Sequence, residues 1–336
     1  MTARHKSWTG WLAAGLIVLG VTAFAMGPFP IELVELMELL WSRLTGAAAT
    51  DSAAVIVLFQ IRLPRVLGAM LAGAALAAAG AAYQGLFRNP LVSPDILGVS
   101  AGAALGAVLG IFLSLPVVGI QVLAFGGGLL TVVLVYGIAN LVRGHEPVLI
   151  LVLAGIVLGA LTGACISLLK ILADPYDQLP AITYWLLGSL AAVTPADIQS
   201  ILPAVGLGLL PLYLLRWRLN LLSLSEEEAR ALGLNTAQLR LVVVSAATLM
   251  TAAVVSISGI IGWVGLIIPH IARLLVGPNF IALLPTSMLL GAIYLLLVDT
   301  LARSLTSTEV PLGILTALLG APFFLWLLAS GRRGWQ

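Results

Sequence analysis

Apolar residues occur along this chain in long runs, and polar residues are concentrated in the short segments between the runs. A helix needs about 20 predominantly apolar residues to cross the hydrocarbon core of a bilayer, and runs of that length recur almost from end to end. Prolines and glycines lie near the ends of the runs, where helices start or stop. The pattern predicts about ten transmembrane helices, with approximate bodies at residues 9–27, 57–86, 95–114, 118–141, 148–171, 189–214, 237–257, 260–276, 283–303 and 312–330.

Composition agrees with a membrane protein and gives no sign of several other classes. Only 9% of the 336 residues are charged and the mean hydropathy is +1.13, whereas a soluble domain carries roughly a quarter charged residues. A net charge of +2 gives no reason to expect nucleic acid as a partner. The single cysteine, Cys165, excludes a disulfide framework, and three scattered histidines do not suggest a metal centre. We therefore predict an all-α polytopic membrane protein with a single transmembrane domain over residues 1–336 and no metal site.

The first 25 residues also resemble a secretory signal, because Arg4 and Lys6 precede an apolar run that ends in Ala23-Phe24-Ala25. We expect an uncleaved first helix instead, since the rest of the chain is apolar spans. After it, residues 30–43 place three glutamates at i, i+3 and i+6 beside apolar residues. That spacing predicts a short amphipathic helix at the membrane interface, with a solvated loop as the alternative.

Lys and Arg residues give the orientation. Ten spans put both termini on one side, and most Lys and Arg residues fall on that side. The positive-inside rule makes it the cytoplasmic side. The segment 223–240, between the sixth and seventh spans, then faces the cytoplasm.

This segment, "SLSEEEARALGLNTAQLR", is unusually polar for the chain, because Glu226, Glu227 and Glu228 are consecutive. A charged residue at the bilayer centre costs roughly 2.5–3.5 kcal/mol on insertion scales, so three glutamates cannot lie in lipid. Ser225 can cap a helix whose third residue is Glu228, and Gly233 suits the left-handed position after its end. The sequence predicts a short cytosolic helix at 225–233, either a solvated connector or a rigid lever that docks into a partner.

Glycines spaced four residues apart predict close helix packing, because they let two backbones approach. The alternatives are packing within one subunit, or a subunit interface or pathway wall. The two ridges consist of Gly98, Gly102, Gly106 and Gly110, and of Gly155, Gly159 and Gly163.

Several blocks in order resemble the FecCD-type family of type II ABC importer permeases for iron-siderophores, haem and cobalamin. The blocks are "RLPRVLGAMLAGAALAAAGAAYQGLFRNPLVSPDILGVSAGA" (62–103), "EEARALGLN" (227–235), "GIIGWVGLIIPHIARLLVG" (259–277) and "EVPLGILTALLGAPFFLWLL" (309–328). The resemblance covers nearly the whole chain. It implies the type II ABC importer permease fold, with both termini cytoplasmic, in the bacterial inner membrane.

The resemblance also implies partners: two ATP-binding subunits that hold ATP and Mg, an extracytoplasmic substrate-binding protein, and a second permease subunit that is identical or related. It makes the helix at 225–233 the coupling helix that docks on the ATP-binding subunit. The coupling residues that it implies are Ser225, Glu226, Glu227, Glu228, Ala229, Arg230, Leu232 and Gly233.

Two further sets of residues are implied by the same resemblance. Arg62, Arg65 and Arg303, at the outer ends of two spans, would meet acidic residues of the binding protein, because a guanidinium can hold a carboxylate bidentately. The alternatives are interfacial snorkelling and, for Arg303, an i,i+4 pair with Asp299. The cytoplasmic gate would include two turns, formed by Asn89, Pro90, Leu91 and Ser93, and by His145, Glu146, Pro147 and Val148. Independently of the resemblance, Ser93 and Pro94 have the residue types of an N-cap and first position for the third span.

The chain carries no motor of its own. Its two lysines, Lys6 and Lys170, are not preceded by the glycines of a phosphate-binding loop, so energy must come from a separate ATPase or from an ion gradient. An ion-coupled transporter usually keeps acidic residues or histidines near the midplane, and here the acidic residues lie near span ends. We predict a non-enzymatic permease subunit that moves a ferric siderophore, with haem or cobalamin as alternative cargoes and a secondary transporter as the competing class.

Overall fold

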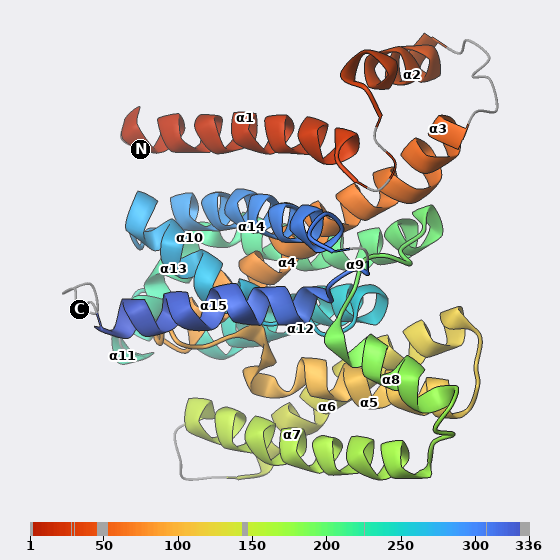
Figure 1. The fold of residues 1–336 in the computed structure, drawn as a ribbon. Coiled ribbons are helices and arrows are strands. Elements are labelled where there is room, and N and C mark those ends of the chain that lie inside the picture. The colour runs from red at the N-terminus through yellow and green to blue at the C-terminus, as the bar shows by residue number, and fades with distance from the viewer. Residues whose placement is uncertain are drawn as a thin grey trace.

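The computed structural model describes residues 3–27, 29, 31–45, 53–142, 147–224, 226–306 and 308–329, and this part of the chain contains helices and no strand (Figure 1). This confirms the predicted all-α class. The helices, with η for a π- or 3₁₀-helix, are α1 Ala3–Ala25, α2 Leu33–Thr45, α3 Ala53–Ile56, η1 Val57–Arg62, α4 Leu63–Leu86, η2 Pro94–Leu97, α5 Val99–Phe112, α6 Val117–Leu141, α7 Pro147–Leu172, α8 Gln178–Leu187, α9 Pro195–Leu214, α10 Arg216–Leu219, η3 Asn220–Ser223, α11 Glu226–Ala231, α12 Thr236–Ser258, α13 Val264–Val276, α14 Phe280–Ala302 and α15 Leu312–Ala329.

The predicted spans all correspond to helices. Within the described residues, 7 helical segments are long and apolar enough to cross a membrane, and three shorter apolar helices lie at Val99–Phe112, Val264–Val276 and Leu312–Leu327. The sixth span begins later than predicted, at Pro195. Its start is fixed by a capping box in which Asp197 N–H donates to Thr194 Oγ1 at 3.3 Å and Thr194 N–H donates to Asp197 Oδ2 at 2.8 Å.

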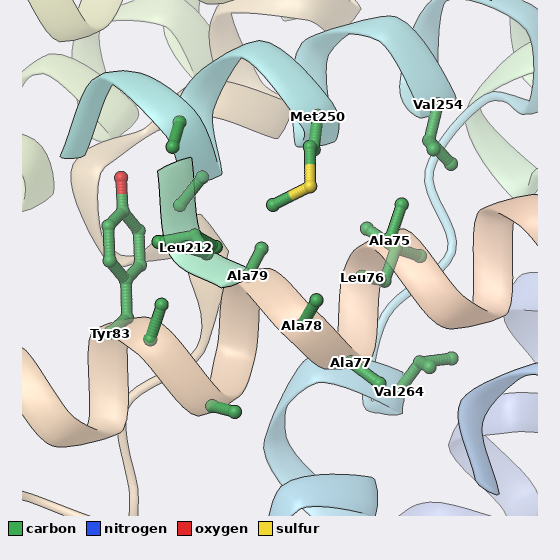
Figure 2. Packing of buried hydrophobic residues seen from close by; sticks show 14 of the residues in the cluster. Ala75, Leu76, Ala77, Ala78, Ala79, Tyr83, Leu212, Met250, Val254 and Val264 are labelled. Atoms are coloured by element: carbon green, nitrogen blue, oxygen red, sulfur yellow. The ribbon is translucent and has the colours of Figure 1, made fainter. Parts of the chain in front are cut away.

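Helix α4 is the centre of the bundle, because it packs against α9, α12, α13 and α14. Its middle is built from small residues, and Figure 2 shows Ala75 to Ala79 facing Met250 and Val254 of α12 and Val264 of α13. A Cβ added at Gly73 would overlap the backbone of Gly291 in α14. Small side chains therefore let α4 lie almost in backbone contact with its neighbours, as is typical of membrane helices.

The two glycine ridges differ in what they face. On α5, a Cβ at Gly102 or Gly106 would overlap the backbone of α6, so this ridge packs within the chain. On α7, Gly155 lies against the backbone of η2, but Gly159 and Gly163 have no atom of the described chain within 4 Å of an added Cβ. The first ridge therefore fits the intramolecular alternative, and the outer part of the second keeps the interface or pathway alternative open.

The start of α1, the end of α15 and the acidic helix α11 lie at the same end of the bundle, and α2 and α8 lie at the opposite end (Figure 1). This is the arrangement that an even number of spans requires. The predicted interfacial helix at 30–43 is present as α2, shifted by a few residues to Leu33–Thr45. Its Leu36 is buried against Ile31 and Leu58, whereas Val34, Met37 and Trp41 are exposed. We use "cytoplasmic end" for the end that carries α11, following the charge distribution, and "outer end" for the other.

Candidate functional site

The acidic helix α11 is held against the membrane helices by one face only. Ala229 is buried against the core, and Glu227, Glu228 and Arg230 are exposed on the outward side. Leu232, just after the helix, is 63% exposed. The outward surface of α11 therefore combines carboxylates, a guanidinium and a bare leucine, a combination that a protein partner can bind more readily than lipid can.

The C-terminal end of this helix and the start of α12 meet at an elbow formed by residues 233–235. Gly233 has a φ of +78°, a left-handed conformation that favours glycine, and it closes the helix. Its N–H donates to Arg230 O at 2.9 Å and Leu234 N–H donates to Ala229 O at 3.0 Å, which together form a Schellman motif. Asn235 then caps α12 by accepting from Gln238 N–H at 3.0 Å. The predicted cap Ser225 lies outside the described residues, as does the side chain of Glu226.

A groove of about 400 Å³ runs beside this elbow. It is lined by Trp217 and Arg218 of α10 and by Leu232 to Asn235. Two backbone hydrogen bonds therefore join the elbow to α11, and Asn235 joins it to the long helix α12, while the groove leaves its other side open. Such a segment can transmit a force applied to α11 directly to a membrane-spanning helix.

The turn at residues 88–93 lies at the same end. Asn89 Oδ1 accepts from Leu91 N–H at 2.9 Å, and the chain then passes through Pro90 to Ser93. Arg88 has a φ of +48° and donates through Nε to Leu222 O at 2.7 Å and through Nη2 to Leu224 O. The structure thus brings this predicted gate turn next to the segment that leads into α11.

The predicted start of the third span needs a correction. Ser93 precedes Pro94 with an extended backbone, but its side chain makes no capping hydrogen bond. The helix that it begins is the 3₁₀-helix η2, which ends at Gly98 with a φ of +77° before α5 starts at Val99. Gly98 is therefore needed for a left-handed turn, in addition to its predicted packing role.

In the second predicted gate turn, Pro147 and Val148 begin α7, and His145 and Glu146 lie outside the described residues.

At the outer end, Arg65 lies in a buried ionic cluster (the outer cluster: Arg65, Asp299, Arg303 and Glu309). Arg65 is 5% exposed and donates through Nε to both carboxylate oxygens of Asp299, at 2.9 and 3.1 Å. Its Nη1 donates to Glu309 Oε1 at 2.7 Å. Arg303 approaches Asp299 at 3.9 Å as an i,i+4 pair and donates to Ala23 O at 2.6 Å. The cluster joins α1, α4, α14 and the segment before α15.

Arg62 is also buried, and it donates to Phe24 O at 2.5 Å and to Phe29 O. It lies in the π-helical turn η1, just before Pro64, which has no N–H to donate. In this conformation the three arginines predicted to dock a binding protein are bonded to the chain itself. The contacts favour the i,i+4 alternative for Arg303, whereas the burial of Arg62 and Arg65 speaks against interfacial snorkelling. The docking role of the three arginines stays a prediction.

Also at the outer end, the segment after α7 leads into the short helix α8. Gln178 Nε2 donates to Phe112 O at 2.9 Å and so ties α8 to the end of α5. Ile182 of α8 is buried against Val108 and Ala173.

Two features of these sites were not foreseen. Glu309 joins the outer cluster from 244 residues away along the chain, and local spacing carries no information about such a contact. Gln84, on the small-residue helix α4, is 2% exposed and bonds to α13. The sequence did hold a signal for Gln84, because it is a lone amide in an apolar span. A buried polar group of this kind must form a hydrogen bond to a partner.

Comparison with known proteins agrees with this architecture. The sequence model of the FecCD transport family matches residues 15–330. The molybdate import system permease protein MolB of Haemophilus influenzae is 43% identical over 321 residues, which are 95% of this chain and 94% of that protein. The "Probable iron chelatin transport system permease protein" of Helicobacter pylori is 41% identical over 323 residues, 96% of this chain and 98% of that protein.

A solved metal-chelate type ABC transporter in an inward-facing conformation superimposes with a TM-score of 0.86 and 40% identity, over 96% of this chain and 98% of that one. The family match runs from residue 15, within α1, to residue 330, and the two relatives are permease proteins of transport systems. They confirm the type II permease fold and a multi-pass protein of the bacterial inner membrane. The chain belongs to the FecCD transport family.

Proposed function

We propose that this chain is the membrane-spanning permease subunit of an ATP-driven importer, and that α11 is the helix through which a separate ATP-binding subunit drives it. The observation that carries the proposal is α11 itself: its charged side and Leu232 face away from the chain, while the Schellman motif closes its end and Asn235, two residues later, caps α12. A merely solvated connector needs neither feature. The family comparisons favour ATP over an ion gradient as the energy source, since they include a solved ABC transporter.

The complete importer then contains two ATP-binding subunits that hold ATP and Mg, a second permease subunit and an extracytoplasmic binding protein. The open part of the α7 glycine ridge, at Gly159 and Gly163, is a candidate surface for the second permease. The outer cluster lies at the end where the binding protein delivers its cargo. Docking through Arg62, Arg65 and Arg303 requires these side chains to exchange their internal partners for carboxylates of that protein.

Charge reversal tests the coupling role. In the first variant, lysine replaces Glu226, Glu227 and Glu228 together. In the matched control, lysine replaces three glutamates at the outer end, Glu32 just before α2 and Glu35 and Glu38 within it. We expect the first variant, reconstituted with its partners in vesicles, to lose stimulation of ATP hydrolysis by loaded binding protein and to lose uptake. The control retains both. Unchanged hydrolysis and uptake in the first variant would refute the coupling role.

For the cargo, we propose a ferric siderophore, because the stretch 89–103 resembles siderophore-type members of the family and the relative from Helicobacter pylori is named for iron chelatin transport. Haem and cobalamin are alternatives from the same class. Molybdate is a second candidate, favoured by the 43% identity to a molybdate permease. Uptake of labelled chelates and of labelled molybdate, compared in cells with and without the gene, distinguishes them: a siderophore cargo predicts loss of chelate uptake and unchanged molybdate uptake, and the reverse pattern would refute it.

A further inference from the structure

A cavity of about 680 Å³ opens at the cytoplasmic end of the bundle, separate from the groove beside α11. Its walls come from the end of α4, from the α10–η3 segment and from the junction of α13 and α14. Among the described residues that line it, two are arginines, Arg88 and Arg273, and none is acidic. The lining therefore carries a net positive charge, and no carboxylate of the lining neutralises it.

Arg273 is held in place by a buried amide. Its Nη2 donates to Gln84 Oε1, and the amide nitrogen of Gln84 donates to Val92 O at 3.2 Å and to Leu266 O at 3.0 Å. These bonds orient Gln84 so that its oxygen faces the guanidinium. Within the described part of the chain, Gln84 is the hydrogen-bond acceptor of the Arg273 guanidinium, so its other nitrogens can donate to a ligand.

Arg88 is fixed on the other side of the cavity by its bonds to Leu222 O and Leu224 O. These bonds use Nε and Nη2 and leave Nη1 for a third acceptor. Both guanidinium groups are therefore positioned by the fold, and neither is neutralised by a salt bridge within the described residues.

The N-terminus of α14 adds a third source of positive potential. Asn279 caps this 23-residue helix, and both Asn279 and Phe280 line the cavity. The first turn of a long helix carries a partial positive charge. Because the N–H groups of Phe280 and Ile281 already donate to Asn220 Oδ1 and Asn279 Oδ1, α14 contributes electrostatic potential to the cavity rather than hydrogen bonds. The remaining wall is apolar at Leu219 and Leu283 and polar at Asn220. An occupant with an anionic head and an adjoining apolar part matches both halves of the lining.

From this lining we infer that the cavity is a binding site for a phosphate group between Arg88 and Arg273. A guanidinium binds phosphate oxygens in a planar, bidentate geometry. The phosphate can belong to an anionic phospholipid of the cytoplasmic leaflet, since basic pockets between helices on that side bind such headgroups. It can also be free inorganic phosphate, which presents the same oxygens.

The test is a thermal-shift titration of the purified, delipidated full-length chain in detergent. The additives are phosphatidylglycerol, phosphatidylcholine as a lipid without net charge, inorganic phosphate, and chloride at matched ionic strength. We expect the unmodified chain to be stabilised by phosphatidylglycerol more than by phosphatidylcholine, or by phosphate more than by chloride. The first result assigns the phosphate to a lipid and the second to a free ion.

Two variants locate the effect. In the double variant Arg88→Gln/Arg273→Gln, the apparent Kd should rise by roughly tenfold or more for each arginine that is removed. A tenfold change in Kd corresponds to about 1.4 kcal/mol. Arg218→Gln removes the same charge from an exposed arginine at the same end and outside this cavity, and it should leave the Kd unchanged.

Either of two results would overturn the inference. One is an unmodified chain that responds equally to the two lipids and equally to phosphate and chloride. The other is a double variant that folds and keeps the affinity of the unmodified chain. The first comparison needs no variant, so it decides the matter even where the double variant fails to fold.

Discussion

The outer cluster predicts a clear loss of stability when the charge of Asp299 is removed. Asp299 is fully buried, and both its oxygens accept from Arg65 Nε. Asp299→Asn keeps the shape but leaves Arg65 and Arg303 without their shared counter-ion. Breaking a buried pair by removing one partner costs about 3–5 kcal/mol, because it leaves an uncompensated buried charge.

The lower end of that range applies here, because Arg65 keeps its 2.7 Å contact to Glu309. Glu309 supplies the matched control: its side chain is 39% exposed, and exposed pairs contribute about 0–1 kcal/mol. We therefore expect Asp299→Asn to lower the free energy of unfolding by about 3 kcal/mol, and Glu309→Gln to lower it by less than about 1 kcal/mol.

The assay is unfolding of the purified chain in mixed micelles by increasing SDS, followed by tryptophan fluorescence. The order of the two variants matters more than their absolute values. Equal losses for the two variants, or a larger loss for Glu309→Gln, would refute the view that the buried Asp299 holds the cluster together.

Two further predictions use the same unfolding assay. Gly127→Ala should destabilise the chain by about 1–3 kcal/mol, because its Cβ would overlap the carbonyl of Gly102; the adjacent Gly126→Ala, which meets open space, should stabilise it by about 0.5–1 kcal/mol. A loss of stability in both variants would contradict the packing argument. Thr194→Ala should cost about 1 kcal/mol, because it removes the side-chain acceptor for Asp197 N–H at the start of α9; no change would show that this cap does not fix the start of the helix.

The positions of the spans could be predicted from the sequence because the length and hydropathy of a run depend only on local residues. The same holds for the acidic helix and for the left-handed Gly233, whose φ of +78° confirms the predicted helix end. The late start of the sixth span was also readable, since Thr194, Pro195 and Asp197 form a capping signal that the hydropathy of residues 189–194 obscured.

The candidate sites were less accessible, because their chemistry depends on contacts between distant segments. The partners of Arg65 lie 234 and 244 residues away, and they turn a predicted docking arginine into part of a buried cluster. The positively charged cavity likewise needs Arg88 and Arg273 to come from different helices. Hydropathy and spacing along a single segment cannot indicate either arrangement.

The most direct test of the account asks what α11 touches in the assembled importer. In a Cys165→Ser background the chain has no cysteine, so Leu232→Cys introduces a single thiol beside α11, and Met37→Cys introduces one on α2 at the outer end. The native side chains are 63% and 61% exposed, which makes the pair closely matched. We predict that a short thiol-directed photocross-linker joins the cysteine at 232, and not that at 37, to the ATP-binding subunit. Cross-linking from 37 alone, or from neither position in a transporter that remains active, would contradict the account.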